Sequence, residues 1–438
     1  MLKRRAAQRC RGHGRSASRS TRIQQLQERL DALKVQAQQL EAGAVGLNAA
    51  TSHDNTRYFM MLPANKLELW FALEAERFQA PGVVHREGGD GEERRAHWEN
   101  SPMGRFTSDY LLQALDNPYR RPAIGFANDF DRFGSHEVAA FFSRYYHPAN
   151  LTISVVGDVD PGKVQQLAER YFGGWRSAPG AVTLDNNVQQ LAAEPLPRPA
   201  AVAASAAGAA AAGVVAAIGV PAAAAATDTL RQLGAGSAAG SGVVWDRTAA
   251  RSGSSREFRQ HTAAGPLLAM GYYRPSVTGR RGTAMEVASD VLSGGRSARM
   301  IKQLVLGGSC LSASVLVGYP GDLHPGLSLV TAVPPSGGDM DRLARDLQQQ
   351  LDGLAQDGPT QAELARVRAA ARAALLSALT SNGSMSGLLA AYHATTGSWR
   401  GVLQELDDVD TLTGPEVAEV VGQVFVEENR FTGLGLPL

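Results

Sequence analysis

A long stretch of low complexity divides this chain of 438 residues into two ordered regions. From about Asn186 to Thr262, alanine, glycine and serine dominate and charged residues are sparse. No helical or strand period is sustained there, which indicates a linker or an insertion, although its alanines favour helix locally. The sequence therefore predicts a first ordered domain at residues 23–185, a linker or insertion at 186–264 and a second ordered domain at 265–438.

The first 22 residues form a separate basic tail. They hold eight lysines and arginines, four serines or threonines and no acidic residue. This composition resembles an organelle transit peptide, but a disordered tail or a mispredicted start would look the same. The tail predicts a chloroplast or mitochondrial location, with the cytoplasm as the alternative.

The remaining composition narrows the classes of partner. The net charge is +1 at pH 7 and the only basic cluster is the tail, so a nucleic-acid partner is disfavoured. The longest uncharged run, residues 199–227, lacks the strongly apolar side chains that a membrane-spanning helix needs. The two cysteines, Cys10 and Cys310, are too few and too far apart for a disulfide framework or a cysteine zinc site. We therefore expect no transmembrane segment and no nucleic-acid partner.

Helix and strand signals alternate in the first ordered region. The expected elements are an amphipathic helix at 23–40, a glycine-punctuated turn at 43–51, a strand at 56–62, a helix opened by Pro63, a charged helix at 92–102 stopped by Pro102, a helix at 137–146, a buried strand at 151–156 and a helix opened by Pro161. Adjacent glutamates in the charged helix, Glu92 and Glu93, can be solvated surface charge or half of a metal site. The alternation argues for an α+β or α/β sandwich rather than a helical bundle.

The second ordered region repeats this kind of order. We expect strands at 267–273 and 327–333, helices at 283–292 and 299–305, a helix lined by Met340, Leu343, Leu347, Leu351 and Leu354, and two helices opened by capping boxes at Thr360 and Thr413. The echo of the first region suggests a structural duplication without visible sequence identity.

A series of short motifs then resembles one known family. In order along the chain they are Gly46-Leu47-Asn48-Ala49, Asp54-x-Thr56-x-Tyr58, Leu67-Glu68-Leu69-Trp70, Glu74-x-Glu76-Arg77-Phe78, Glu92-Glu93-Arg94-Arg95, Glu99-Asn100-Ser101-Pro102, Pro118-Tyr119, Pro122-x-Ile124-Gly125, Tyr145-Tyr146-x-Pro148-x-Asn150, Val156-Gly157-Asp158-Val159 and Ser293-Gly294-Gly295-Arg296-Ser297-x-Arg299. This order is similar to that of the insulinase/pitrilysin family of zinc metallopeptidases, the inverzincins. The resemblance implies an α+β fold of two duplicated α/β sandwich domains, the first of them truncated at its N-terminus.

The chemistry that this resemblance implies needs an H-x-x-E-H helix. Its two histidines and a distant glutamate bind zinc, and the intervening glutamate is the general base. By resemblance, Glu93 stands where the distant ligand belongs. No two of the nine histidines are four residues apart with a glutamate between them. His97 follows Glu93 at helical spacing, but two ligands make a weak site. The resemblance therefore implies zinc as the family cofactor, an incomplete site and no catalytic residue in this chain.

The second domain of active relatives contributes substrate-binding groups, often an arginine and a tyrosine. Arg299 matches the arginine that follows the glycine motif and is predicted to bind substrate. The region expected to hold the tyrosine, residues 309–313, has none.

Two functional hypotheses follow. In the first, the chain is part of a zinc endopeptidase that degrades peptides, and the given sequence is an N-terminally incomplete version that is inactive by itself. In the second, it is a non-catalytic subunit that pairs with a homologous partner carrying H-x-x-E-H. A serine or cysteine hydrolase is disfavoured, because neither cysteine lies in an activating setting and no G-x-S-x-G elbow follows a strand.

Overall fold

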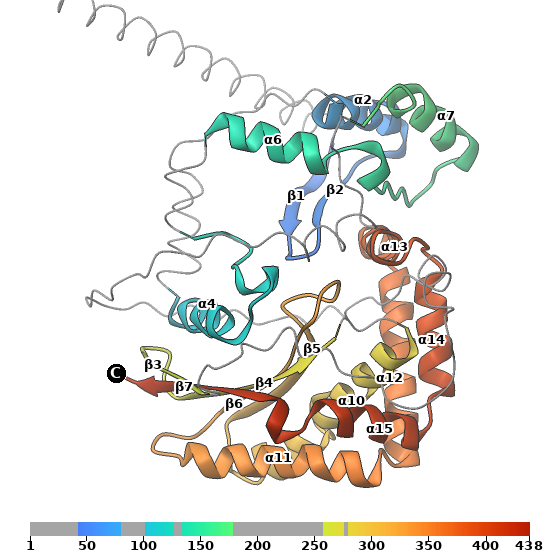
Figure 1. Cartoon of the computed structure of the whole chain (residues 1–438). Coiled ribbons are helices and arrows are strands. Elements are labelled where there is room, and N and C mark those ends of the chain that lie inside the picture. The colour runs from blue at the N-terminus through green and yellow to red at the C-terminus, as the bar shows by residue number, and fades with distance from the viewer. Residues whose placement is uncertain (1–42, 80–100, 127–133, 178–256, 276–278) are drawn as a thin grey trace, which may run out of the picture.

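The structure is a computed structural model, and it describes residues 43–79, 101–126, 134–177, 257–275 and 279–438. The expected helix at 23–40, the charged helix up to residue 100 and most of the linker lie outside the described residues. The described chain forms two bodies, one above the other in Figure 1. We call residues 43–79 and 134–177 the small body, and residues 101–122 together with the described residues from 257 to 438 the large body.

The large body is built on a five-stranded sheet. The strands are β3 (Glu257–Thr262), β4 (Leu267–Arg274), β5 (Ser312–Tyr319), β6 (Gly326–Val333) and β7 (Arg430–Pro437), in the order β3-β7-β4-β6-β5. Only the β3–β7 pair is parallel. Its helices are α4 (Pro102–Ala114), η3 (Pro118–Arg120), α10 (Arg280–Ser293), the π-helical η6 (Ile301–Val305), α11 (Met340–Asp357), α12 (Gln361–Leu379), α13 (Asn382–Thr396), α14 (Gly401–Thr411), α15 (Gly414–Val424) and η7 (Glu427–Asn429). The mixture of helices and mainly antiparallel strands confirms the predicted α+β class.

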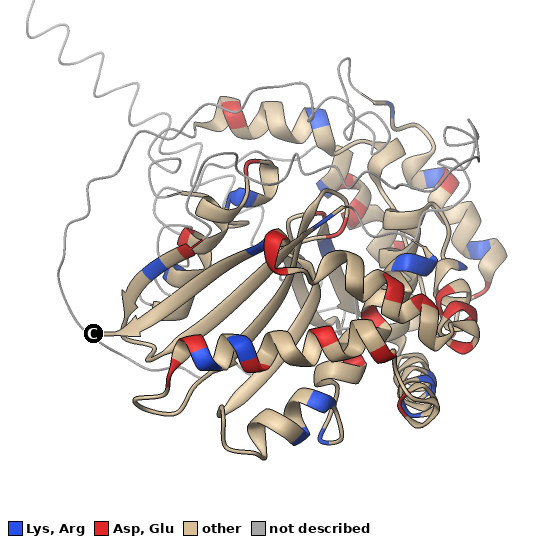
Figure 2. Ribbon diagram, turned by 60° about the horizontal axis from the view of Figure 1, so that its bottom comes forward, with Lys and Arg blue, Asp and Glu red and all other residues tan. Residues whose placement is uncertain are grey.

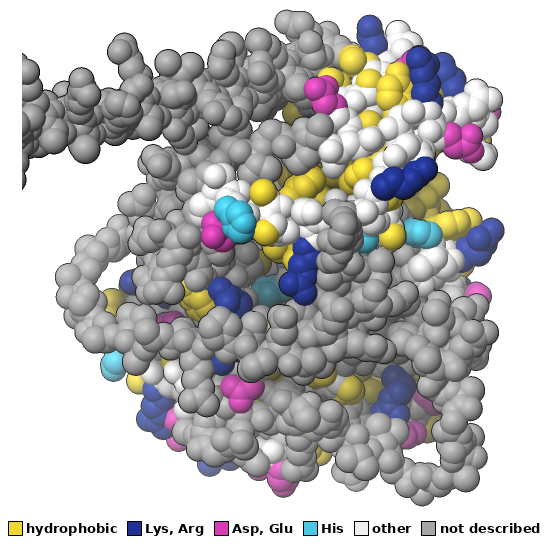
Figure 3. Space-filling view, turned by 45° about the horizontal axis from the view of Figure 1, so that its top comes forward, with side chains coloured by type: hydrophobic (Ala, Val, Ile, Leu, Met, Phe, Trp, Pro, Cys, Tyr) yellow, Lys and Arg dark blue, Asp and Glu magenta, His cyan; other side chains and the backbone are white. Residues whose placement is uncertain are grey.

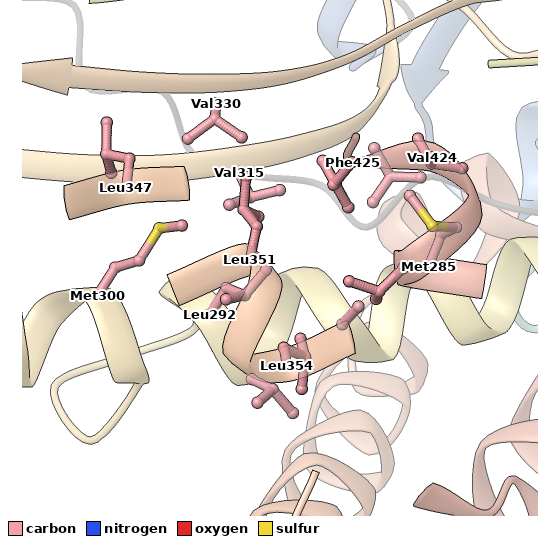
Figure 4. Close-up of a cluster of buried hydrophobic side chains, with 14 of the residues drawn as sticks. Met285, Leu292, Met300, Val315, Val330, Leu347, Leu351, Leu354, Val424 and Phe425 are labelled. Carbon is pink, nitrogen blue, oxygen red and sulfur yellow. The ribbon is translucent and has the colours of Figure 1, made fainter. Parts of the chain in front are cut away.

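The main core lies between one face of this sheet and helices α10, α11 and α15 (Figure 4). The leucine stripe predicted for α11 is buried here, with Leu347, Leu351 and Leu354 at 0% exposure. The opposite side of α11 carries charges of both signs toward solvent (Figure 2). Both predicted capping boxes are present, at the starts of α12 and α15, so local sequence signals fix where these helices begin.

Helix α4 covers the other face of the sheet, although it lies more than 140 residues away from that sheet's first strand in the sequence. The Tyr110 side chain lies over Gly271 and Gly433: an added Cβ on Gly271 would run into its hydroxyl, and one on Gly433 would lie 2.5 Å from its ring. The Tyr110 hydroxyl donates to the Phe431 carbonyl oxygen at 2.8 Å. Glycine at these two sheet positions therefore makes the slot that seats the helix.

The small body has much less regular structure. It contains the hairpin of β1 (Val45–Thr51) and β2 (Thr56–Met61), η1 (Ala64–Lys66), α2 (Leu67–Gln79), α6 (Ser135–Tyr145), η4 (Pro148–Asn150) and α7 (Pro161–Phe172). Its core consists of Leu67, Phe71 and Leu167 with partly buried neighbours such as Trp70 and Tyr171. The predicted strand at 56–62 and the helices after Pro63 and Pro161 are confirmed.

Several expectations from the sequence are wrong. Residues 45–51 were expected to be a turn but form β1, because pairing with β2 overrides their glycine and alanine content. Residues 151–156 were expected to be a buried strand, but they pair with no strand in the described chain and are at best half-buried. Pro102 was expected to end a helix, but it occupies the first position of α4, where a missing N–H costs nothing. Strand β3 falls within the segment expected to be linker.

No helix in the described ranges combines the length and the apolar character needed to cross a bilayer.

Candidate functional site

The predicted zinc ligand cannot be placed. Glu93 and His97 both lie outside the described residues. The description resumes at Ser101, which caps α4 by accepting a hydrogen bond from the Gly104 N–H at 3.1 Å. Within the described ranges, no three His, Cys, Asp or Glu side chains are grouped so that they could hold a metal ion. The described part of the chain therefore does not fit a zinc centre, and Glu93 as a ligand stays a prediction.

Arg299, the predicted substrate-binding residue, is engaged in an ion pair. Its Nε and Nη2 donate to the two carboxylate oxygens of Glu363, both at 2.8 Å, and Nη2 also donates to the Gly358 carbonyl oxygen at 2.8 Å. Hydrogen bonds from Arg299 lower the pKa of Glu363 to about 2. Glu363 closes the α12 capping box at the same time. This geometry gives Arg299 a structural partner, and substrate binding by it stays a prediction.

A connected polar cluster lies where the two described bodies meet. The β1–β2 turn of the small body places Asp54 against Tyr119 and against the β5–β6 loop of the large body. The Tyr119 hydroxyl donates to Asp54 Oδ1 at 2.5 Å, and the Asp322 N–H donates to Asp54 Oδ2 at 2.8 Å. The Tyr119 hydroxyl also accepts the His324 N–H at 3.0 Å. Both oxygens of the Asp54 carboxylate thus have donors from the large body.

Two histidine rings border this cluster. His53 and His324 each meet the Tyr119 ring edge-on, with centroids 5.8 Å and 5.3 Å away. His53 Nε2 lies 2.9 Å from the Arg121 carbonyl oxygen, which can only accept, so this nitrogen carries the proton. Burial lowers the pKa of both histidines and raises that of Tyr119. At neutral pH the tyrosine is therefore a donor and the histidines are neutral.

The buried side chain of Arg274, on β4, holds the β5–β6 loop in place. Its side chain is 0% exposed and donates to Asp322 Oδ1 at 2.7 Å, to the Gly321 carbonyl oxygen at 2.8 Å and to the Val317 carbonyl oxygen at 2.7 Å. The nearby Glu286 carboxyl has its pKa raised to about 8, first by burial and then by the charges of Asp322 and Glu405. A carboxyl that is largely protonated at neutral pH is a poor metal ligand. The cluster can therefore hold the loop and the turn in place, but it presents no activated nucleophile.

The sequence places Asp54 and Tyr119 within family motifs but assigns neither of them a role. The signal that could have found them is the occurrence of both in the family motifs, Asp54-x-Thr56-x-Tyr58 and Pro118-Tyr119. The partners at Asp322 and His324 carry no such signal. They are more than 200 residues away in the sequence and are brought in by the fold alone.

Comparison with known proteins identifies the family. A family model described as the Peptidase M16 inactive domain matches residues 133–207 and 217–371, together more than half of the chain. The chain therefore belongs to the M16 peptidase family, and the resemblance to insulinase/pitrilysin metallopeptidases is confirmed. The zinc protease PqqE of Helicobacter pylori is 34% identical over 131 residues, which are 28% of this chain and 30% of that protein.

Solved structures show the same fold. A protease from Helicobacter pylori has a TM-score of 0.68 at 21% identity, with 92% of this chain and 84% of that chain covered. The first half of the periplasmic protease PqqL from Escherichia coli has a TM-score of 0.57 at 15% identity, with 90% and 75% covered. At these identities the likeness establishes the fold alone. The matched segments span about a third or less of the curated relatives' own lengths.

Proposed function

We propose that this chain is the non-catalytic member of a two-part zinc peptidase and pairs with a homologue that carries H-x-x-E-H. The observation that carries the proposal is the absence of the histidine pair from a chain whose family model describes an inactive domain. Glu93 is the candidate for one inherited ligand position, and zinc and peptide substrates would belong to the pair as a whole.

The surface of the small body supports pairing. Helix α6 buries none of its residues, and Phe141 on it is 58% exposed. On the hairpin, Phe59 and Met61 are 50% and 51% exposed. Hydrophobic side chains gather on this part of the molecule in Figure 3. Exposed apolar groups in such number favour burial against another protein surface.

The test is to co-express the chain with an H-x-x-E-H-bearing homologue from the same source. We expect the two to co-elute as a complex on size-exclusion chromatography and cleavage of a quenched fluorescent peptide to exceed that of the homologue alone. A second test is Phe141→Ser on the exposed side of α6, which should weaken the complex without unfolding the chain. A chain that remains a monomer beside its homologue at micromolar concentration would contradict the proposal.

A second candidate is an endopeptidase of which this sequence is one part. It is favoured by the order of family motifs at 46–159, which includes the Glu93 position. Coding sequence upstream of Met1 that contains H-x-x-E-H in frame would support it, and full-length transcripts without such sequence would exclude it.

The compartment remains a proposal from the basic tail. The curated relatives that match are bacterial proteins, and they lend no support to an organelle. Fusing residues 1–22 to a fluorescent protein tests whether the tail directs import into a chloroplast or mitochondrion.

A further inference from the structure

The two bodies meet through few described contacts, and most of these are polar. Besides the Asp54 cluster, the Ser386 hydroxyl on α13 donates to the Ser154 carbonyl oxygen at 3.0 Å. Met61 on β2 lies near Gly383 at the start of α13. Among the residues that the structure describes, the hydrophobic clusters do not cross this boundary: two lie wholly in the large body and one in the small body. The relative position of the bodies therefore depends on polar groups.

The large body builds the receiving side of the junction by itself. Asn117 accepts the Tyr119 N–H at 3.1 Å and donates to the Pro325 carbonyl oxygen at 2.5 Å, which ties η3 to the β5–β6 loop. Arg274 holds the same loop through Gly321 and Asp322. The Tyr119 hydroxyl and the Asp322 N–H are thus positioned by residues of the large body.

The small body contributes the Asp54 carboxylate to this prepared site, and His53 of the same turn donates from Nε2 to the Arg121 carbonyl oxygen at 2.9 Å. Asp54 lies in a four-residue turn in which the Ser52 N–H donates to the Asn55 carbonyl oxygen at 2.8 Å and the Ser52 hydroxyl accepts the Asp54 N–H at 3.2 Å. The fit is close: a Cβ on Gly321 would lie 2.4 Å from Asp54 Oδ2 and 2.8 Å from the Tyr119 hydroxyl. Gly321 has an ordinary backbone angle, so its side of the contact depends on space and not on a left-handed conformation.

We propose that the Ser52–Asn55 turn is a polar latch. Through the hydrogen bonds of Asp54 it fixes the small body on the large body, and it opens without unfolding either body. The reason for separate opening is that residues 52–55 belong to none of the described hydrophobic clusters and touch the core of the large body only at the Tyr119 side chain. Contacts with few buried apolar groups open at lower free energy than core strands do. The inference concerns a joint within this chain and does not depend on pairing with a homologue.

Hydrogen exchange followed by mass spectrometry tests the latch on the full chain. The amides of Asp322 and His324 report on it directly, because they donate to Asp54 and to Tyr119. Asp54→Ala should accelerate exchange of the Asp322 amide at least about tenfold, since a hydrogen bond to a charged group contributes more than the ~1.4 kcal/mol that a factor of ten requires. The His324 amide should accelerate less, because its acceptor is the neutral Tyr119 hydroxyl, which Asp54→Ala leaves in place but frees from its own acceptor. Gly321→Ala attacks the same contact from the other side and should give the same pattern. Asp158→Ala, at an exposed turn of the small body, is the matched control and should change nothing.

The amides of β4 and β6 separate a local opening from a general loss of stability. The latch requires their exchange to stay unchanged in Asp54→Ala and Gly321→Ala. Unaltered exchange at Asp322 and His324 in both variants overturns the proposal. So does acceleration that spreads equally into β4 and β6, or failure of both variants to fold.

Discussion

The two bodies solve the same problem of burial to very different extents. The large body places 0%-exposed leucines, valines and methionines between a five-stranded sheet and three helices, and α4 closes the opposite face. The small body has a two-stranded hairpin and a core of three buried residues. An isolated two-stranded hairpin is marginally stable in water. The comparison indicates that, among the described residues, the large body holds most of the buried apolar core and the small body holds little of it.

Truncating a core side chain should reveal the largest difference in stability between the two bodies. Leu351→Ala removes a fully buried side chain of α11 and is expected to cost about 2–5 kcal/mol in the free energy of unfolding of the large body. The matched change Phe71→Ala, also at 0% exposure, should loosen α2 and α7 and leave β4 and β6 protected from hydrogen exchange. Urea unfolding together with exchange measures both. Loss of protection in β4 and β6 after Phe71→Ala would show that the bodies are one cooperative unit.

Filling the glycine slot should displace α4. Gly433→Ala puts a Cβ 2.5 Å from the Tyr110 ring and is expected to cost about 1–3 kcal/mol by overpacking. Chemical denaturation measures the loss. Adding Tyr110→Leu should recover part of it, because the shorter side chain vacates the slot. Equal destabilisation by the single and double variants would mean that the ring is not the source of the clash.

The Arg299–Glu363 pair should contribute less, about 1–2 kcal/mol, because both side chains are partly exposed. The pKa of Glu363 is lowered from 4.5 to about 2, so its contribution is complete above pH 4.5 and is lost as the pH falls toward 2. Glu363→Gln should remove this part of the acid sensitivity in thermal unfolding. Arg299→Lys should also destabilise, since an ammonium cannot reproduce the two parallel bonds. If Arg299→Lys leaves thermal unfolding unchanged, the arginine is free for another role.

Mild acid should have the smallest effect, confined to the junction. His53 and His324 both face Tyr119 and lie near the Asp54 carboxylate. The Asp322 carboxylate on the β5–β6 loop forms an ion pair with Arg274. Burial lowers the pKa of both histidines below 6.5, so they stabilise the closed junction while neutral, and this is lost as the pH falls below 6.5. Exchange at the Asp322 amide, corrected for intrinsic rate, should therefore accelerate between pH 7.5 and 5.5. The double variant His53→Gln and His324→Gln should abolish that pH dependence; a persistent one would assign it to another group.

The sequence predicts best where the signal is local. The leucine stripe of α11, the two capping boxes, the start of α7 at Pro161 and the helix that follows Pro63, where η1 leads into α2, all depend on a few neighbouring residues, and each is confirmed. Strand β1 was missed because its identity depends on pairing with β2. The apolar run at 151–156 shows the reverse error, since an apolar composition cannot supply a ladder partner.

The junction could not be predicted from periodicity or spacing. Asp54 meets Asp322 across 268 residues, and Tyr110 meets Phe431 across 321. Only the folded sheet determines that glycines 271 and 433 face that tyrosine. The zinc site, by contrast, is predicted only from the family resemblance, and the role of Glu93 as a zinc ligand stays a prediction.

The most direct test of the account is peptide cleavage by the purified chain of 438 residues in the presence of zinc. Because no histidine pair is present to complete a site around Glu93, we predict no cleavage of a quenched fluorescent peptide above the buffer rate. Cleavage that is inhibited by a chelator and lost in Glu93→Ala would contradict the account.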